Sequence, residues 1–343
     1  SGLQDFRTSG LQDFRTSGQR DIIADSLRGF AILLVVVGHV SDRLDFHSEL
    51  IYSFHMPLFF MIAGYAHGMK AHFSSGQKFS GYLKKYFVEL YFPMLYFSLI
   101  VWLQKYLRSS LAHDIKGLEL ASIENFYNIP LLGHGVQWFI CTLFFVKTLH
   151  ILLEKSCQRK ALHSAFWVLL FALIISFKSY LPEFIARFSY GFYFHVGYVL
   201  RQRNLLTTNT PHKLSCGIIL LTIGLIIFAL PDSGQLSSKL VAISLSLAVF
   251  LIFYALGIRN SFLVKCGVCS MVIYIVHMRI IGIVNSLFVI TGLSSIVSPV
   301  FSFTVYSVLS VLVPLAIVWT YTHIKCLSWI EYIFYPGKFF LTK

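Results

Sequence analysis

The first apolar segment of the chain is DSLRGFAILLVVVGHV over residues 25–40, and it carries one guanidinium and one imidazole among aliphatic side chains. Arg28 and His39 are eleven positions apart. On an α-helix this separation is about 20° more than three full turns and about 16.5 Å along the axis, so both side chains lie on one face. Because ionisable groups inside an apolar helix are costly to bury, the pair marks a candidate functional position.

The composition of the whole chain is that of a membrane protein. Of its 343 residues, 56% are hydrophobic and 13% are charged, whereas about 25% of residues are charged in a soluble domain. The apolar runs do not show the alternating pattern of membrane β-strands, so helices are expected. We predict an all-α polytopic membrane protein with about ten transmembrane helices. The predicted spans are approximately 22–40, 51–69, 86–103, 136–153, 161–177, 184–200, 214–230, 240–258, 267–290 and 300–321.

The net charge of +13 does not indicate a nucleic-acid partner, because the basic residues lie in short loops rather than in one patch. The expected partner is the lipid bilayer. If the N-terminus is cytoplasmic, most loop lysines and arginines fall on the cytoplasmic side, as the positive-inside rule requires. The sequence therefore predicts that both termini are cytoplasmic. It gives no oligomeric state.

The two ends of the chain differ from the apolar middle. An octapeptide, Ser-Gly-Leu-Gln-Asp-Phe-Arg-Thr, occurs twice in succession at the start, so we interpret residues 1–18 as a tag remnant. Residues 19–322 form the predicted transmembrane domain. Residues 323–343 are aromatic and basic, which is typical of an interfacial cytoplasmic tail.

The cysteines do not indicate a metal centre. Cys266 and Cys269 have C-x-x-C spacing, but there is no second pair and no histidine set with zinc spacing. We interpret the pair as small packing residues, and no metal is expected.

The second apolar segment, YSFHMPLFFMIAGY over residues 52–65, contains Pro57 and His55. A proline inside a spanning helix frees a carbonyl group and favours a kink or a pocket wall. His55 is expected near the outer end of the first helix pair. It either meets His39 or lies at the membrane interface, and the sequence leaves both alternatives open.

These two segments together carry a family resemblance. Asp25-x-x-Arg28-Gly29, followed after ten residues by His39, and the stretch FHMPLFF at 54–60 leading to Gly64-Tyr65 resemble the membrane-bound acyltransferase family 3. The similarity is closest to its branch of fucose 4-O-acetylase-like sugar acetyltransferases. The stretches QWFI at 137–140 and YIVH at 274–277 add weaker similarity.

The resemblance implies transfer of an acetyl group from acetyl-CoA to a hydroxyl of a cell-surface saccharide or its lipid-linked precursor, in the bacterial cytoplasmic (inner) membrane. It implies that His39 is the essential histidine and Arg28 the essential basic residue. We expect His39 to act as a general base, although a covalent acetyl-histidine relay stays open. Asp25, three residues before Arg28, is expected to position it.

The acetyl-CoA phosphates need cations at the cytoplasmic face. The candidates are Arg28 and, less strongly, Lys84, Lys85, Arg201 and Arg203. Many relatives carry an Arg-x-x-Arg pair at the start of the third helix. This chain has Lys84-Lys85 there, with Glu89 about where the second arginine would fall, and lysine lacks the bidentate fork of arginine.

Four further residues are candidates for binding the acceptor. Trp138 at the start of the fourth run could stack on a sugar ring. His55, Glu89 and His277 lie within apolar runs. His150 and His195 are expected to be core or interface histidines.

Two other function classes compete with the enzyme. The first is a proton-coupled secondary transporter or saccharide exporter that uses His39, Glu89 and Lys147. The second is a lipid-scrambling or scaffold protein without turnover. The matched residues around Arg28 and His39 favour acyl transfer over both.

Overall fold

The computed structural model describes residues 21–69, 79–111, 123–133, 135–156, 159–206, 212–230 and 234–337. Within these ranges the chain forms helices joined by turns, and they contain no strand. This confirms the predicted all-α class. The interpreted tag remnant, residues 1–18, lies outside the described residues.

The chain divides into two compact units. The first unit comprises Ser1–Ala71 and Val196–Ile330, and the second comprises His72–His195 and Glu331–Lys343. Helix α10, Tyr190–Gln202, contributes residues to both. The remaining helices of the first unit are α1 (Ile22–Arg43), α2 (Glu49–Gly68), α11 (Lys213–Ala229), α12 (Gln235–Ala255), α13 (Ser261–Val268), α14 (Ser270–Ile290), η6 (Leu293–Ser295), α15 (Pro299–His323) and η7 (Lys325–Leu327).

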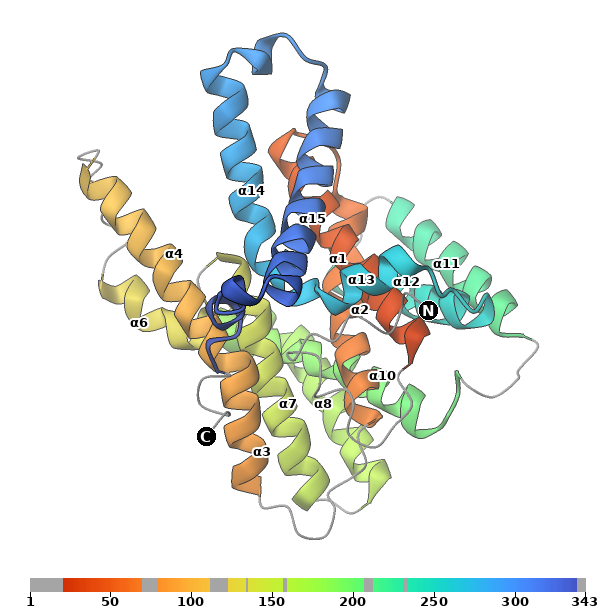
Figure 1. Ribbon diagram of the computed structural model, residues 1–343. Helices are drawn as coiled ribbons and strands as arrows, with labels where there is room; N and C mark the ends of the chain where they lie inside the picture. Colours follow the sequence, from red (N-terminus) through yellow and green to blue (C-terminus); the bar gives the residue numbers. More distant parts are fainter. Residues whose placement is uncertain are drawn as a thin grey trace. The chain divides into compact units, whose positions relative to one another are not determined.

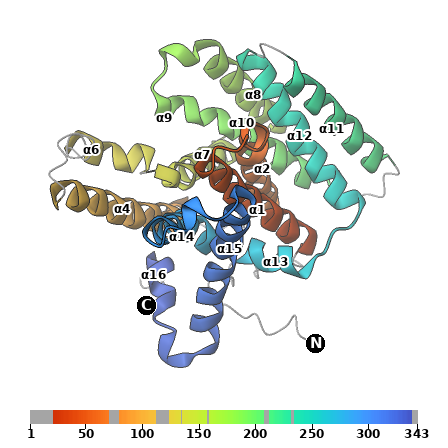
Figure 2. The ribbon, with the colours of Figure 1, turned by 90° about the horizontal axis from the view of Figure 1, so that it is seen from above.

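Helix α1 is the central element of the first unit. It packs against α2, α12, α13, α14 and α15, while α11 pairs with α12 and α14 pairs with α15 (Figures 1 and 2). The Asp21 side chain caps α1 by accepting a hydrogen bond from the Ala24 N–H at 3.0 Å. Leu27, Ala31 and Val35 recur at near-helical spacing and are buried. The helix that carries Arg28 and His39 is therefore surrounded by other helices of its unit.

Helices α1 and α13 cross at two glycines. A Cβ on Gly29 would stand 1.8 Å from the Leu263 carbonyl oxygen, and a Cβ on Gly267 would stand 2.0 Å from the Asp25 carbonyl oxygen. Only residues without a side chain allow this approach of the two backbones. The crossing fixes α13 against the first two turns of α1.

The C-x-x-C pair flanks this crossing. Cys266 and Cys269 are buried and have free thiols. Burial raises the pKa of the Cys266 thiol to about 11. Burial, together with the neighbouring Cys266, raises the pKa of the Cys269 thiol to about 12. Buried, protonated thiols behave as small apolar groups, which supports the packing interpretation.

The second unit contains a π-helical turn. The N–H of Phe92 bonds to the carbonyl of Phe87, five residues earlier, and the next residue, Pro93, has no N–H to continue the α-helical ladder. The helices of this unit are α3 (Phe79–Tyr86), η2 (Phe87–Tyr91), α4 (Phe92–Leu111), α6 (Ile123–Leu132), η3 (Gly135–Gln137), α7 (Trp138–Ser156), α8 (Lys160–Phe177), η4 (Lys178–Tyr180), α9 (Glu183–Ala186), η5 (Arg187–Ser189) and α16 (Ile330–Phe334).

Seven helices in the described part of the chain are long and apolar enough to cross a membrane. They are Ile22–Arg43, Phe79–Leu111, Gly135–Ser156, Lys160–Tyr180, Gln235–Ala255, Ser270–Ile290 and Pro299–His323.

The predicted number of about ten spans is not confirmed. Run 51–69 forms α2, which contains Pro57 and is not among the seven helices. Run 184–200 is divided among α9, η5 and α10, and run 214–230 forms α11, which has 17 residues. All three runs are helical, but each is a weaker candidate for a span. Polar residues are interspersed in run 51–69, run 184–200 is broken, and run 214–230 is short. The cytoplasmic location of both termini stays a prediction.

Candidate active site

Helix α1 carries Arg28 and His39 on one face. The helix is uninterrupted from Ile22 to Arg43, so the two side chains leave it in nearly the same direction, as their spacing predicts. Both are partly buried. Asp25, one turn before Arg28, is buried at 8% exposure.

His39 belongs to a hydrogen-bonded chain of three side chains. The Tyr52 hydroxyl on α2 donates to Asp42 Oδ2 and lies 3.1 Å from His39 Nδ1. A phenol has one proton to donate. Because Tyr52 gives that proton to Asp42, the bond to His39 is one in which the Nδ1–H donates to the phenol oxygen. The lone pair of the neutral imidazole is therefore on Nε2.

The connection between α1 and α2 builds this chain. Asp42 lies in the last turn of α1, and Tyr52 lies in the first turn of α2. Between them Asp45 adopts a left-handed backbone conformation, φ 56°, which shortens the turn. Ser48, the residue that precedes α2, donates its hydroxyl to Asp42 Oδ1. Both carboxylate oxygens of Asp42 are thus held by α2 and the residue before it.

His277 on α14 faces His39. Their ring centroids are 5.3 Å apart with an interplanar angle of 32°. The Nδ1–H of His277 donates to the Ile273 carbonyl at 3.0 Å, which leaves the lone pair on Nε2. His277 is fully buried, and its Nε2 has no hydrogen-bond partner among the described residues. Such an orphaned acceptor costs about 1–3 kcal/mol, and His277 Nε2 can accept a hydrogen bond from a group that lies beside His39.

His55 reaches His39 through Tyr52. Its ring lies edge-on to the Tyr52 ring at 5.2 Å, and its Nδ1–H donates to the Ile51 carbonyl at 2.8 Å. His55 is buried at 4% exposure. The structure thus favours the alternative in which His55 belongs to the group around His39. We call His39, Asp42, Tyr52, His55 and His277 the imidazole cluster.

A second polar network closes the N-terminal end of α1. Asp21 Oδ2 accepts from the hydroxyls of Tyr65 at 3.1 Å and Tyr254 at 2.7 Å. Arg201 donates from Nη1 to the Tyr65 hydroxyl at 3.2 Å and lies 4.0 Å from Asp21 Oδ2. The Arg201 charge is therefore partly compensated by Asp21. Arg203, just beyond α10, is exposed.

The remaining basic candidates lie in the second unit. Lys84 is exposed on α3. Lys85 lies 3.5 Å from Glu89, one turn later. Lys147 on α7 lies over the Tyr86 ring at 4.1 Å from its centroid. Glu89 thus compensates Lys85, which makes Lys84 the more available of the two adjacent lysines.

Trp138, the candidate for sugar stacking, has a cation beside its ring. The Arg187 guanidinium lies 5.0 Å from the Trp138 ring, and the Tyr190 ring lies 5.4 Å from it. Arg187 also donates to the Leu132 carbonyl at 2.8 Å. Trp138 is partly buried, so only part of its surface is open to a ligand.

Asp42 and Tyr52 are the site residues that the sequence did not reveal. Asp42 follows His39 by three positions on one helix, which is a weak signal for a contact. Tyr52 lies in the second segment, three residues before His55. Nothing in that spacing indicates that the phenol joins Asp42 to His39, because the turn between the helices makes the contact.

The imidazole cluster can perform proton transfer. His39 Nε2 is the free base nitrogen, and the proton on Nδ1 is oriented toward Asp42 through Tyr52. A positively charged His39 would be stabilised by the Asp42 carboxylate through this chain. His277 offers a second acceptor nitrogen but has only a backbone carbonyl behind it.

Comparison with known proteins gave one match. The family model described as an acyltransferase domain, acyltransferase family 3, matches residues 22–319. This range includes the imidazole cluster and both ends of α1. No curated protein and no solved structure matched the chain.

Proposed function

The chain belongs to acyltransferase family 3, and from this premise we propose that it transfers an acetyl group from acetyl-CoA to a hydroxyl of a cell-surface saccharide or its lipid-linked precursor. The observation that carries the proposal is the Asp42–Tyr52–His39 chain, which leaves His39 Nε2 as a base. The long apolar helices make the protein a multi-pass membrane acyltransferase.

His39 is the general base. The acceptor O–H bond breaks and its proton goes to His39 Nε2, while the alcohol oxygen bonds to the thioester carbonyl carbon. The C–S bond then breaks, and the proton passes from His39 to the departing sulfur, so that the products are an acetyl ester and the CoA thiol. Asp42 stabilises the imidazolium between these two transfers.

His277 positions the acceptor. Its Nε2 lone pair is buried beside His39 and can accept a hydrogen bond from an alcohol or from a neighbouring sugar hydroxyl. His277 is a poorer base than His39. Its Nδ1–H donates to the neutral Ile273 carbonyl, whereas the Nδ1–H of His39 is linked through the Tyr52 hydroxyl to the Asp42 carboxylate. This difference supports His39 as the base and His277 as a binding group.

Arg28 holds the donor. Acetyl-CoA is a polyanion whose thioester stands at the end of a long flexible arm, so its phosphates and its reacting carbon are far apart. A phosphate contact at Arg28 and a reaction at His39 match that separation, at about 16.5 Å along one helix. Arg201, which lies on α10 beside Asp21 and Tyr65, is a further candidate for the phosphates. Arg203, Lys84 and Lys85 are supporting candidates only.

We propose a saccharide as the acceptor because the first two apolar segments resemble fucose 4-O-acetylase-like sugar acetyltransferases. We propose the bacterial inner membrane as its location, because a cytoplasmic donor and a cell-surface product require an enzyme that spans it. His55, beside Tyr52 in the imidazole cluster, is proposed to contact the saccharide.

The test is acetyl transfer by purified protein in detergent, with labelled acetyl-CoA and a panel of saccharide acceptors. Substituting His39→Ala is expected to lower kcat by about 10²–10⁴-fold. Substituting Arg28→Ala is expected to raise the KM for acetyl-CoA. The matched control His47→Ala removes an exposed histidine and is expected to keep full activity. Undiminished transfer by His39→Ala would exclude the proposed base.

The transporter alternative is tested by the same measurement. The family match does not favour it. A detergent micelle has no gradient, so a proton-coupled carrier has no turnover there, whereas an acyltransferase keeps its chemistry. Gradient-dependent sugar uptake in proteoliposomes without any acetyl transfer would overturn the proposed function.

A further inference from the structure

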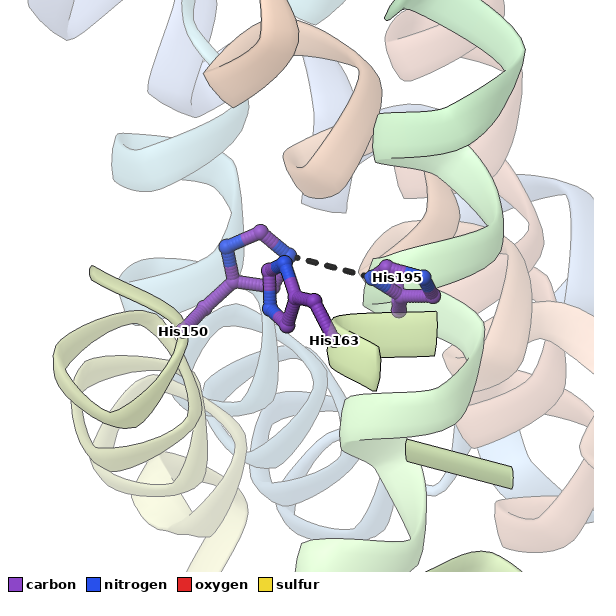
Figure 3. Close-up of side chains that lie close together, drawn as sticks. All are labelled: His150, His163 and His195. Carbon is purple, nitrogen blue, oxygen red and sulfur yellow. Dashed lines mark hydrogen bonds between the residues drawn. The ribbon is translucent and has the colours of Figure 1, made fainter. Parts of the chain in front are cut away.

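Three buried histidines meet in the second unit. His150 on α7, His163 on α8 and His195 on α10 are exposed by 0%, 5% and 5%, and Figure 3 shows their rings grouped together. They are separated in sequence by 13 and 32 positions, so no short motif joins them. They are not part of the imidazole cluster, and the proposed reaction does not use them.

The rings are close enough to share one small ligand. The ring centroids are 4.4 Å apart for His150 and His163, 4.9 Å for His163 and His195, and 5.5 Å for His150 and His195. One nitrogen from each ring lies within 4.8 Å of the other two.

One pair already has the spacing of metal ligands. His150 Nε2 and His195 Nδ1 are 3.3 Å apart (Figure 3). Nitrogens at about 2.0–2.1 Å from a tetrahedral zinc ion are separated by about 3.3–3.4 Å. The pair therefore needs little movement to bind one ion, while the His163 nitrogen, within 4.8 Å of the other two, must approach by up to about 1.5 Å to complete the set.

Neighbouring side chains orient these rings. His195 Nε2 lies 2.9 Å from the Ser164 hydroxyl, and in the tautomer in which its N–H donates there the lone pair is on Nδ1. A ligating histidine characteristically donates its other N–H to such a partner. Trp167 Nε1–H donates to His163 Nε2 at 3.2 Å. Binding through that nitrogen displaces the indole hydrogen bond.

The backbone around the group is tightly packed. The Trp167 ring is fully buried and stacks on His150 at a centroid distance of 5.9 Å and an angle of 20°. Gly191 on α10 makes room for it, since a Cβ there would stand 1.9 Å from a ring carbon of Trp167. The three helices are thus held at a fixed distance before any ion binds, which lowers the entropic cost of binding.

The chemistry of the ligands selects the ion. Neutral imidazole nitrogens suit zinc and other late first-row divalent ions, whereas magnesium and calcium require oxygen ligands. In the His195 tautomer with its lone pair on Nδ1, His150 Nε2–H donates to His195 Nδ1, so binding of an ion moves the His150 proton from Nε2 to Nδ1 and releases none. Glu154 follows His150 by one turn of α7 and supplies negative charge near the site.

We propose that His150, His163 and His195 form a binding site for one divalent transition metal ion, and Zn²⁺ is the best match. The bound ion would join α7, α8 and α10. The alternative is a purely hydrogen-bonded histidine network. The role assigned to the ion is stabilisation of these helices, so the proposal is independent of the proposed acetyl transfer.

The experiment is a Co²⁺ titration of the full chain, purified without a histidine tag and freed of metal by chelation. We expect one Co²⁺ per chain, with the visible bands of a tetrahedral ion, and their loss when Zn²⁺ is added. Because Trp167 must give up its bond to His163, its fluorescence is expected to change in the same titration. The absence of a tetrahedral spectrum at one equivalent would overturn the proposal.

Two substitutions and one control locate the site. His163→Gln is expected to weaken binding by more than about 100-fold, beyond the 10–100-fold typical of outer-shell changes. Trp167→Phe removes the competing N–H and is expected to tighten binding several-fold, a result that a misfolded variant cannot give. His47→Gln, at an exposed histidine, is expected to bind as the unaltered protein does.

Thermal unfolding provides a readout apart from spectroscopy. Zn²⁺ is expected to raise the Tm of the unaltered protein and of His47→Gln, but not that of His163→Gln. Equal Co²⁺ binding by His163→Gln and the unaltered protein would overturn the proposal. So would a Zn²⁺-induced rise in Tm that is the same for these two proteins.

Discussion

At the scale of single residues, the tautomer of His39 decides what this site can do. An imidazole beside an alcohol is a base only if the nitrogen that faces the alcohol is unprotonated. Tyr52 and Asp42 favour that state, because the phenol oxygen accepts a hydrogen bond from the Nδ1–H of His39 while its own proton is donated to Asp42. In the proposed reaction the same two residues stabilise the charge that His39 acquires, so their loss should lower the rate without weakening the binding of the donor.

The first prediction concerns Tyr52→Phe. The substitution keeps the ring but removes the hydroxyl that joins Asp42 to His39, so both tautomers become accessible and the imidazolium loses its carboxylate. We expect kcat to fall by about 10–100-fold, within the contribution of a general base, at unchanged KM for acetyl-CoA. Steady-state kinetics with labelled donor measures both. Tyr180→Phe, at a tyrosine that is 85% exposed, is the matched control.

The second prediction separates His277 from His39. Because His277 is assigned to binding, His277→Ala should raise the KM for the saccharide more than it lowers kcat, whereas His39→Ala should lower kcat at any acceptor concentration. Saturation curves for the acceptor with both variants make the comparison. A kcat for His277→Ala as low as that of His39→Ala would reverse the two assigned roles.

At the scale of elements, the crossing of α1 and α13 determines where α1 lies. Two glycines, one on each helix, allow backbone contact without intervening side chains. This contact is formed over the same turns that carry Asp25 and Arg28. A change in the crossing should therefore disturb the stability of the first unit and the position of Arg28 together.

The third prediction compares two glycine substitutions. Gly29→Ala places a Cβ against the Leu263 carbonyl, and we expect a loss of about 1–3 kcal/mol, typical of an overpacked contact, with a lower Tm. Gly282→Ala on α14 meets nothing within 4 Å, and alanine favours a helix. Its Tm should be unchanged or higher. Thermal unfolding of the detergent-solubilised variants tests the pair, and equal Tm values would contradict the crossing.

The fourth prediction concerns the C-x-x-C pair. Since burial raises the pKa of Cys266 to about 11 and that of Cys269 to about 12, their thiolate fractions are very small at pH 8. Single-cysteine proteins retaining either residue should resist a maleimide until they are unfolded. A protein that retains only Cys326, which is exposed, should react at once. Fast reaction at Cys266 at pH 8 would refute the packing role.

At the scale of the whole molecule, the lengths of the apolar helices and the distribution of loop charge determine which segments can span the bilayer and in which orientation. Among the residues that the structure describes, seven helices satisfy the length and composition of a span. The three weaker helical segments contain a proline, a break or too few residues. Loop charge then predicts the orientation of the chain, because lysine and arginine are generally retained on the cytoplasmic side.

The fifth prediction concerns orientation. A single cysteine at position 343 should be labelled by a membrane-impermeant reagent only after the inner membrane is opened, since both termini are expected in the cytoplasm. A cysteine in place of Lys178, an exposed residue that loop charge assigns to the outside, should be labelled in intact cells. The opposite labelling pattern would invert the predicted topology, and with it the side from which the donor approaches Arg28.

The sequence by itself determined the helical class, the alignment of Arg28 with His39 and the resemblance in the first two segments. These features depend on composition and on spacing along one helix, which are local properties of the chain. The tertiary structure decided which groups His39 meets. Tyr52 reaches it through a turn, and His277 reaches it across 238 positions. Contacts of this kind depend on loop geometry and on the packing of whole helices, and neither leaves a periodic signal in the sequence.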